Sequence, residues 1–286
     1  MRLSLNAILF NAAGIGVLLF VGGYMINSAF HTEETAGCHL RYGNGQQFSL
    51  QSSNGRKLTN IELQARLPVR EWGLLDSARV VEAQEGKAQY LQVALGPVAG
   101  NDQRSDETAD ALDTRKDGVG FVWAPSGLDK ARAACLSYRV FLPKDFSFDA
   151  PGKLPGLYAT REIADLDDDA PRSGFVSRLG WQKGGGIGVA LRTPGSPETW
   201  FGARKETWPV GRWVSIEQEV TLGSAGRSDG LLRIWIDGVL RIEKTGLNLG
   251  MSDQDALSGV VADLGYDRKR TVPGRLTISP FILQGQ

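Results

Sequence analysis

The sequence predicts an all-β protein, an antiparallel β-sandwich or jelly roll, preceded by one N-terminal transmembrane helix. Two observations favour this fold class. Thirty-six glycines and 12 prolines separate short apolar runs, and most of these runs alternate in polarity with the period of a strand. Beyond residue 30, no window of helical length shows a helical period. Many short strands joined by glycine-rich turns are typical of sandwiches and jelly rolls.

Strands are predicted along most of the chain, and they form one domain over residues 46–286. No composition shift divides this region, and the polar stretch 100–116 is predicted to be a long exposed loop. Asp237-Gly238 indicates a tight hairpin. The predicted strands are 61–67, 88–95, 118–123, 135–142, 175–182, 187–192, 213–222, 231–236, 239–242 and 276–283.

The balance of charge excludes a protein that attracts polyanions by its overall field. Lys and Arg together number 32, and Asp and Glu together also number 32. A chain without net charge has no global attraction for nucleic acid or for acidic lipid. We therefore expect no nucleic-acid partner, and any electrostatic preference must be local.

The N-terminus is predicted to anchor the protein in a membrane. Residues 3–30 carry no charged side chain, Arg2 precedes them, and Glu33 and Glu34 follow. This length suits a membrane-spanning helix, and the positive-inside rule places the following chain outside the cytoplasm. The alternative is a cleaved signal peptide, since the most apolar part, residues 12–21, is short. Both alternatives place the domain in the cell envelope or outside it, after a polar spacer over residues 31–45.

The chain has two cysteines, Cys38 and Cys135, and an exported protein is expected to join them in a disulfide. Thr35-Ala36-Gly37-Cys38 also resembles a lipoprotein cleavage site. Charged residues separate that site from the apolar run, however, and lipidation would leave Cys135 alone. The disulfide is therefore the preferred interpretation.

Two segments in the middle of the chain carry cations where a sheet would position them. Lys153 lies in the Gly-Pro-Gly corner 152–157, and Arg178 lies in the alternating strand 175–182. Within that strand, Ser177 belongs to the apolar, packed face. If a glycine-rich turn at 183–186 pairs the next strand in register, Arg178 and Arg192 share an open face with no adjacent acid. That arrangement predicts an anion site, although solvated surface cations are an equally simple explanation.

The aspartates 165, 167, 168 and 169 form an acidic cluster between Lys153 and Arg178. Clustered carboxylates are able to bind Ca²⁺, but the spacing of an EF-hand is absent. A solvated, lid-like loop is the preferred interpretation. No metal and no cofactor are therefore predicted for this protein.

Several motifs follow one another in order along the second half of the chain: 137–143, 152–158, 173–175 with Arg178 and Trp181, 212–213 and 232–238. This ordered series resembles polysaccharide lyase family 14, the alginate and glucuronan lyases. The resemblance runs from about Cys135 to the C-terminus, and Lys153 and Arg178 match the family's lysine and arginine. It implies a jelly roll with a cleft across one sheet, and β-elimination of a uronic-acid polymer: the carboxylate is neutralised, a base removes the C5 proton and an acid assists departure of the 4-O group.

The chain departs from the family at the positions that transfer protons. The family's serine position falls on Val176, and its tyrosine positions fall at about Ala190 and Arg192. Tyr158 and Tyr266 are the remaining tyrosines expected to reach a cleft, although Tyr158 also suits a half-buried core position. His39, Glu217 and Glu219 are weaker candidates for a base.

Two hypotheses follow. The first is a membrane-tethered uronan lyase in which Lys153 and Arg178 bind the carboxylate and Tyr158 or Tyr266 transfers protons. The second is a non-catalytic glycan-binding component of exopolysaccharide synthesis or secretion, with that assembly machinery as a partner. In both, the expected ligand is a polysaccharide, which the resemblance implies to be anionic, and a neutral glucan stacking on Trp200 or Trp208 is the alternative. The further predicted substrate contacts are Gln182, Arg192, Trp200, Arg204 and Lys205. Arg204 and Lys205 lie between Trp200 and Trp208 in a segment that is predicted to be a rim loop.

Overall fold

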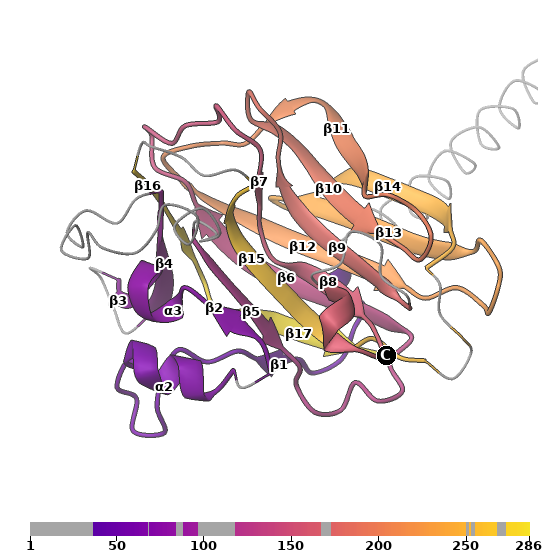
Figure 1. The fold of residues 1–286 in the computed structure, drawn as a ribbon, viewed down its shortest axis with the longest axis horizontal. Helices are drawn as coiled ribbons and strands as arrows, with labels where there is room; N and C mark the ends of the chain where they lie inside the picture. Colours follow the sequence, from indigo (N-terminus) through magenta and orange to yellow (C-terminus); the bar gives the residue numbers. More distant parts are fainter. Residues whose placement is uncertain are drawn as a thin grey trace, which may run out of the picture.

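Two antiparallel sheets packed face to face form the body of the protein, as predicted (Figure 1). The computed structural model describes residues 37–286 apart from 68, 84–87, 97–117, 167–172, 250–251, 253–254 and 268–272. The predicted N-terminal helix, the loop 100–116 and Asp167–Asp169 lie outside these residues. Within them, no helix combines the length and apolar character needed to cross a membrane.

The first sheet, here sheet I, has nine strands. Along its main path the strands are β14 (Val239–Leu247), β13 (Gly230–Ile236), β12 (Trp213–Thr221), β6 (Ala133–Phe141), β16 (Gly274–Ile278), β4 (Gln89–Leu95) and β3 (Ala78–Glu82). β17 (Ile282–Gly285) pairs with β6 and also with β1 (Gln46–Gln47).

The second sheet, here sheet II, has eight strands. Its path is β11 (Thr199–Thr207), β10 (Gly186–Arg192), β9 (Phe175–Trp181), β7 (Gly152–Lys153), β15 (Gly259–Tyr266), β5 (Val119–Trp123) and β2 (Glu71–Trp72). β8 (Gly156–Ala159) continues after β7 and pairs with both β15 and β9. β11 and β15 were not predicted, and β11 occupies the segment expected to be a rim loop.

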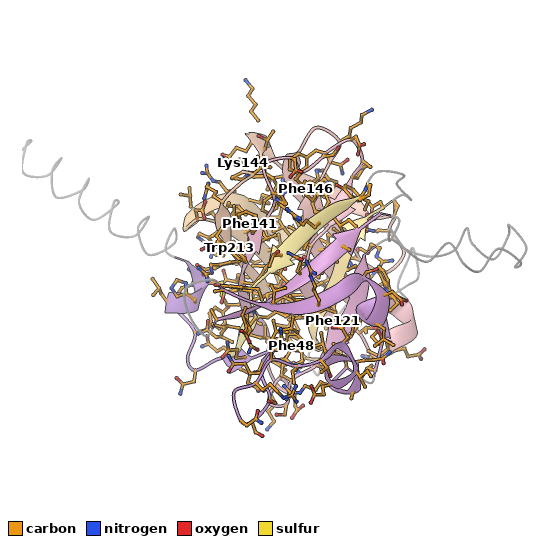
Figure 2. The ribbon with its side chains drawn as sticks, turned by 90° about the vertical axis from the view of Figure 1, so that its left-hand side faces the viewer. Phe48, Phe121, Phe141, Lys144, Phe146 and Trp213 are labelled. Carbon is orange, nitrogen blue, oxygen red and sulfur yellow. A yellow bond between two sulfur atoms is a disulfide. The ribbon has the colours of Figure 1, made fainter. Side chains whose placement is uncertain are left out.

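The core lies between the sheets and is rich in aromatic side chains. The ring of Phe48 stacks at 5.5 Å on Phe121 and at 5.5 Å on Phe281, and Figure 2 shows Phe48 beside Phe121. Trp208 also belongs to this core, and its indole N–H donates to the Gly180 carbonyl at 2.9 Å. The suggestion that Trp208 stacks on a sugar is therefore wrong.

Two predicted strands take other forms. Residues 61–67 were predicted as a strand, but the helix α2 (Asn60–Ala65) runs through them. Thr59 begins this helix with a capping box to Glu62, and a helical turn places Leu63 and Leu67 together in the core. A second short helix, α3 (Leu74–Ser77), lies nearby at the same end of the sandwich (Figure 1).

The predicted strand 276–283 is divided at Pro280 into β16 and β17. Proline has no N–H to donate to a sheet ladder, so the pairing is interrupted there. By contrast, the predicted hairpin between β13 and β14 is confirmed. Asp237 and Gly238 have φ angles of 50° and 75°, and two positive angles in succession are the geometry of its tight turn.

The predicted disulfide is confirmed, since Cys38 is bonded to Cys135. Cys38 begins the short 3-10 helix η1 (Cys38–Leu40), which packs on β6 and β12. Gly37 and Cys38 are buried. The folded body therefore begins within the stretch 31–45 that was predicted as a spacer.

Candidate functional site

Lys153 stands on the outer face of sheet II, in a row of residues that otherwise carry no side chain. It pairs directly with Gly180 of β9 and with Gly265 of β15, and Gly180 pairs with Gly188 of β10. Directly paired residues project to the same side of a sheet. The lysine side chain, 30% exposed, therefore has room along the row, and its Nζ lies 3.0 Å from the carboxylate of Asp267.

Trp200 of β11 covers one end of this glycine row. A Cβ atom built on Gly188 would lie 2.3 Å from the Trp200 ring, so the indole rests directly on the glycine backbone. Two strand spacings, roughly 10 Å, separate β10 from β7 and its Lys153. The row from Trp200 to Lys153, with Gly188 and Gly180 between them, is called the glycine track below.

Arg178 lies beside this track, but it is buried. The register pairs Arg178 with Ala190, and Arg192 with Val176, so the two arginines share the outer face as predicted. Only 3% of Arg178 and 7% of Arg192 is exposed. The prediction of an open face is therefore wrong.

A carboxylate that the sequence analysis overlooked neutralises Arg178. Asp263 of β15 lies 2.6 Å from Arg178 and 3.2 Å from Arg70. Burial raises the pKa of Asp263, but Arg178 first, then Arg70 and Lys153, lower it, and the net shift is downward. Asp263 is thus an anion paired with Arg70 and with Arg178, the arginine that was expected to bind substrate.

The 3-10 helix η2 (Ile163–Leu166) covers both arginines from outside. The Leu166 carbonyl accepts hydrogen bonds from Arg178, at 3.3 Å, and from Arg192. The Leu166 side chain packs in a small apolar cluster with Val122, Tyr158, Val176 and Val261. Arg192 also lies 3.8 Å from Glu198. The prediction of two arginines without an adjacent acid is therefore wrong.

The two candidate tyrosines are placed away from Lys153. Tyr158 is buried in the apolar cluster under η2, and burial raises its pKa to about 12, against a smaller lowering by Arg70. Tyr266 faces the core, where its ring packs against Phe146 and Trp181. Its hydroxyl donates to the Ser147 carbonyl at 2.7 Å. Of the two alternatives for Tyr158, the buried core position is the one that the structure adopts.

The remaining predicted contacts lie at the margin of sheet II. Gln182 is exposed where β9 turns toward β10, and Lys205 is exposed on β11. Arg204 belongs to the same strand, β11, which is regular sheet where a loop was predicted. Ser177 faces inward as predicted, is fully buried, and accepts a hydrogen bond from Gln218 of the opposite sheet.

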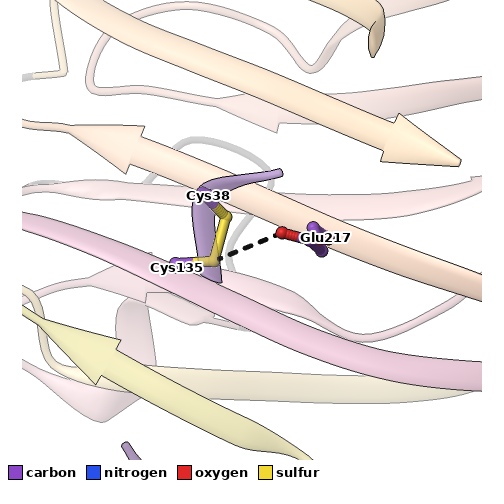
Figure 3. A group of neighbouring side chains, drawn as sticks. All are labelled: Cys38, Cys135 and Glu217. Atoms are coloured by element: carbon purple, nitrogen blue, oxygen red, sulfur yellow. Dashed lines mark hydrogen bonds between the residues drawn. A yellow bond between two sulfur atoms is a disulfide. The ribbon is translucent and has the colours of Figure 1, made fainter. Parts of the chain in front are cut away.

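The weaker candidates for a base lie on the other sheet. Glu219 of β12 pairs with Arg41 at 2.7 Å, and Glu217 pairs with His39 at 2.8 Å. Glu217 also lies 4.0 Å from the sulfur of Cys135 (Figure 3). A disulfide sulfur has no proton to donate and no thiolate to bind a metal, so this group is a close contact and not a metal site.

The model of the polysaccharide lyase 14 family matches residues 105–266, more than half of the chain. This chain belongs to the polysaccharide lyase 14 family. The matched region includes Lys153, Arg178 and the whole of β15. A search of curated proteins found no match.

Solved structures of alginate lyases share the fold of this family member. An alginate lyase from Aplysia kurodai superposes with a TM-score of 0.64 and 17% identity, over 85% of this chain and 100% of that chain. The alginate lyase Aly36B gives 0.59 and 13%, over 85% and 97%. The alginate lyase vAL-1 from Chlorella virus gives 0.57 and 14%, over 73% and 90%. At such low identity these likenesses show the shared fold of two packed antiparallel sheets and nothing more.

Asp263, Arg70 and Leu166 are the site residues that sequence reasoning missed. One signal was present: a single aspartate interrupts the run Val260-Val261-Ala262-Asp263-Leu264. A carboxylate in such an apolar strand indicates a buried ion pair. No local signal identifies its partners, because Arg70 precedes it by 193 residues.

Proposed function

We propose that this protein binds a polysaccharide on the outer face of sheet II without cleaving it. Membership of a polysaccharide lyase family supports a polysaccharide ligand. The glycine track supplies a binding surface with an indole at one end and an ammonium group near the other. The indole packs against the apolar face of a sugar ring, and Lys153 attracts an oxygen or carboxylate of the same chain.

The observation that carries this proposal is the buried ion pair between Arg178 and Asp263. Arg178 occupies the position expected to neutralise a uronate carboxylate during elimination. Here an internal carboxylate and the Leu166 carbonyl already contact its Nη2. A substrate carboxylate would have to displace Asp263 from a low-dielectric environment, which costs several kcal/mol for each unpaired charge.

Neither of the two candidate tyrosines is placed to transfer a proton beside Lys153. Tyr158 is buried with a raised pKa, and the Tyr266 hydroxyl is bonded to the Ser147 carbonyl. Efficient general acid–base catalysis needs a group within hydrogen-bond reach whose pKa is near the working pH. Binding has neither requirement, so the geometry favours recognition over elimination.

The proposal is tested with the purified domain, on alginate and on glucuronan. Elimination creates an unsaturated uronate whose ultraviolet absorbance rises with time, and we expect no rise with either polymer. Affinity electrophoresis in gels containing each polymer should show retardation that is weakened in Lys153→Ala and in Trp200→Ala. Lys183→Ala, which removes an exposed lysine from the 183–186 turn, is the matched control.

Eliminative cleavage is the second candidate function, and the position of Lys153 favours it. The amine is on the sheet face, 30% exposed, and matches the lysine of the family motif. A rise in absorbance that Lys153→Ala abolishes, with polymer binding retained, would establish the lyase and refute the non-catalytic proposal.

The anchored location is also part of the proposal. We infer that residues 3–30 hold the domain at the outer side of a membrane, where it contacts exopolysaccharide and its synthesis or secretion machinery. The Cys38–Cys135 disulfide is consistent with an oxidising compartment. Fractionation of cells expressing the full chain tests this, since the protein should stay with membranes at high salt. Release of a shortened soluble form would instead indicate a cleaved signal peptide.

A further inference from the structure

A hollow lies on the outer face of sheet I, on the side of the sandwich opposite to the glycine track. Its volume is about 630 Å³, within the range of roughly 300–1,000 Å³ that is usual for small-molecule sites. Its lining comes from separate parts of the chain: His39, Gln47, residues 49–51, 88–90, 137–139, 215–217 and 279–280, and Ile282. Arg178 does not line it, and neither does any residue of the glycine track.

Polar side chains from the neighbouring strands β6 and β12 form the floor of the hollow. Ser137 lies directly opposite Glu217, and Arg139 lies directly opposite Ser215. Even numbers on β6 point into the core, as Leu136, Tyr138 and Val140 do, so these odd-numbered residues share the outer face. The floor thus presents a carboxylate, a guanidinium and two hydroxyls within a small area.

One wall is formed by an aromatic and cationic group around Arg139. The Tyr90 ring lies 4.7 Å from the Trp213 ring, and the Arg139 guanidinium lies over Trp213 at 5.4 Å. Arg139 also donates to the Tyr90 hydroxyl at 3.4 Å. Trp213 packs in turn on Phe141, and Figure 2 shows these two rings side by side. The aromatic contacts hold Arg139 and Tyr90 at the edge of the hollow.

The opposite wall is held in place by the disulfide. The Cys38–Cys135 bond fixes η1 on sheet I, next to the hollow. His39 then bonds Glu217 twice, by its backbone N–H at 3.0 Å and by its ring Nδ1 at 2.8 Å. The imidazole is half exposed, at 50%, whereas the Glu217 side chain is 11% exposed. The covalent link therefore positions a polar group at the rim of a preformed site.

We infer that this hollow is a second saccharide-binding site. Its lining contains both hydrogen-bond donors and hydrogen-bond acceptors. Arg139 donates, Glu217 accepts, and Gln47, Ser137 and Ser215 can do either, while Tyr90 adds an aromatic ring. Sugar hydroxyls both donate and accept hydrogen bonds, and their ring faces pack on aromatic groups. A compact polyanion such as phosphate suits the site poorly, because the Glu217 carboxylate forms part of the floor. An apolar ligand would leave these polar groups unsatisfied.

Two sites on opposite faces would allow one domain to hold two polysaccharide strands, or two parts of one strand. This consequence goes beyond the proposed function, because it does not depend on Lys153 or on the glycine track. The proposal of a second site can therefore be confirmed or refuted independently of the proposed function. A variant that loses binding at one face should keep it at the other.

The test measures binding of two hexasaccharide probes, cellohexaose and an alginate hexasaccharide, by NMR chemical-shift titration of the domain. The expected result is that at least one probe shifts the resonances of residues around Arg139. Loss of a hydrogen bond to a charged group should weaken that binding about tenfold or more in Arg139→Ala. Gln47→Ala, at an exposed position, should weaken it less, and Lys153→Ala should leave it unchanged.

Arg275→Ala is the matched control, since Arg275 is an exposed arginine on β16 of the same sheet, outside the hollow. Thermal unfolding of every variant checks that the fold is retained. Ser137→Trp provides a second, steric variant that should block the hollow. Binding that is unaffected by both Arg139→Ala and Ser137→Trp would overturn the inference, and so would the absence of binding by both probes at millimolar concentration.

Discussion

Arg178 and Asp263, on strands that are not neighbours, form a buried ion pair with 2.6 Å between Nη2 and Oδ2. β7 and β8 lie between β9 and β15, and the pair forms on the outer face near the break between β7 and β8 at residues 154–155. Arg70 and the Leu166 carbonyl complete the group. In this family member, the arginine of the lyase motif is thus part of the folded framework.

Removing Asp263 should destabilise the protein strongly. Asp263→Ala leaves the Arg178 guanidinium buried without its carboxylate, and breaking a buried pair in this way typically costs about 3–5 kcal/mol. Urea unfolding followed by tryptophan fluorescence measures this loss. Asp267→Ala removes the partner of Lys153 from a partly exposed pair, and should cost roughly 0–1 kcal/mol. Equal, small losses for both variants would contradict the structural role given to Asp263.

The ion pair between Arg161 and Asp255 should weaken in acid. Hydrogen bonds from Arg161 lower the pKa of Asp255 to about 2, against the opposing effect of burial, and Ser252 assists. The pKa of an unfolded aspartate is about 3.9. The stabilisation is therefore complete above pH 4 and is lost as the pH falls toward 2.

This pH dependence is measured by comparing the wild-type protein with Asp255→Asn. The difference in unfolding free energy, up to about 1 kcal/mol for a pair near the surface, should shrink toward zero between pH 4 and pH 2. Arg161 lies two residues before η2, so the same titration should loosen the cover over Arg178. A difference that stays constant over this range would show that Asp255 has no lowered pKa.

Reduction of the disulfide should lower stability substantially. The bond joins residues separated by 97 positions, and closing a loop of this length restricts the unfolded chain by about 4–5 kcal/mol in the chain-entropy model. Chemical unfolding with and without reductant measures the change, and the double variant Cys38→Ser/Cys135→Ser should reproduce it. An unchanged unfolding midpoint after full reduction would be inconsistent with this expectation.

Gln218 links the two sheets through the core, and its replacement should be costly. Its side-chain oxygen accepts from the Leu157 N–H at 3.1 Å, and its amide donates to the Ser177 hydroxyl. Gln218→Leu leaves a buried N–H without its acceptor, which typically costs about 1–3 kcal/mol. Ser177→Ala should be milder, because it removes only one of the two bonds. In a double-mutant cycle the two losses should be less than additive, whereas full additivity would argue against a direct bond.

The sequence predicted most strands because alternation is a local property. β4, β5, β6, β9, β10, β12, β13 and β14 all overlap predicted segments. β15 was missed because Asp263 interrupts its apolar run, and β11 was missed because Gly202 and charged residues weaken its pattern. The segment 61–67, predicted as a strand, contains helix α2. The capping box between Thr59 and Glu62 is the local signal for this helix, and the alternating pattern of 61–67 does not reveal it.

The candidate site was predicted in part. The lysine, the arginines and their common face follow from motif and register, and so does the inward direction of Ser177. Burial of the arginines did not follow, because it depends on η2 folding back over β9 and β10. The placement of Tyr266 differs from expectation for a similar reason, since its partner carbonyl is at Ser147, 119 residues away.

The sequence by itself determined the fold class, the disulfide partners and the family, because these depend on periodicity, on residue identity and on the order of motifs. Only the tertiary structure decided whether Arg178 faces a ligand or a carboxylate of its own chain. Electrostatic pairing acts between groups that are close in space. Arg178 and Asp263 are 85 positions apart in the sequence, but their charged groups are 2.6 Å apart in the folded chain.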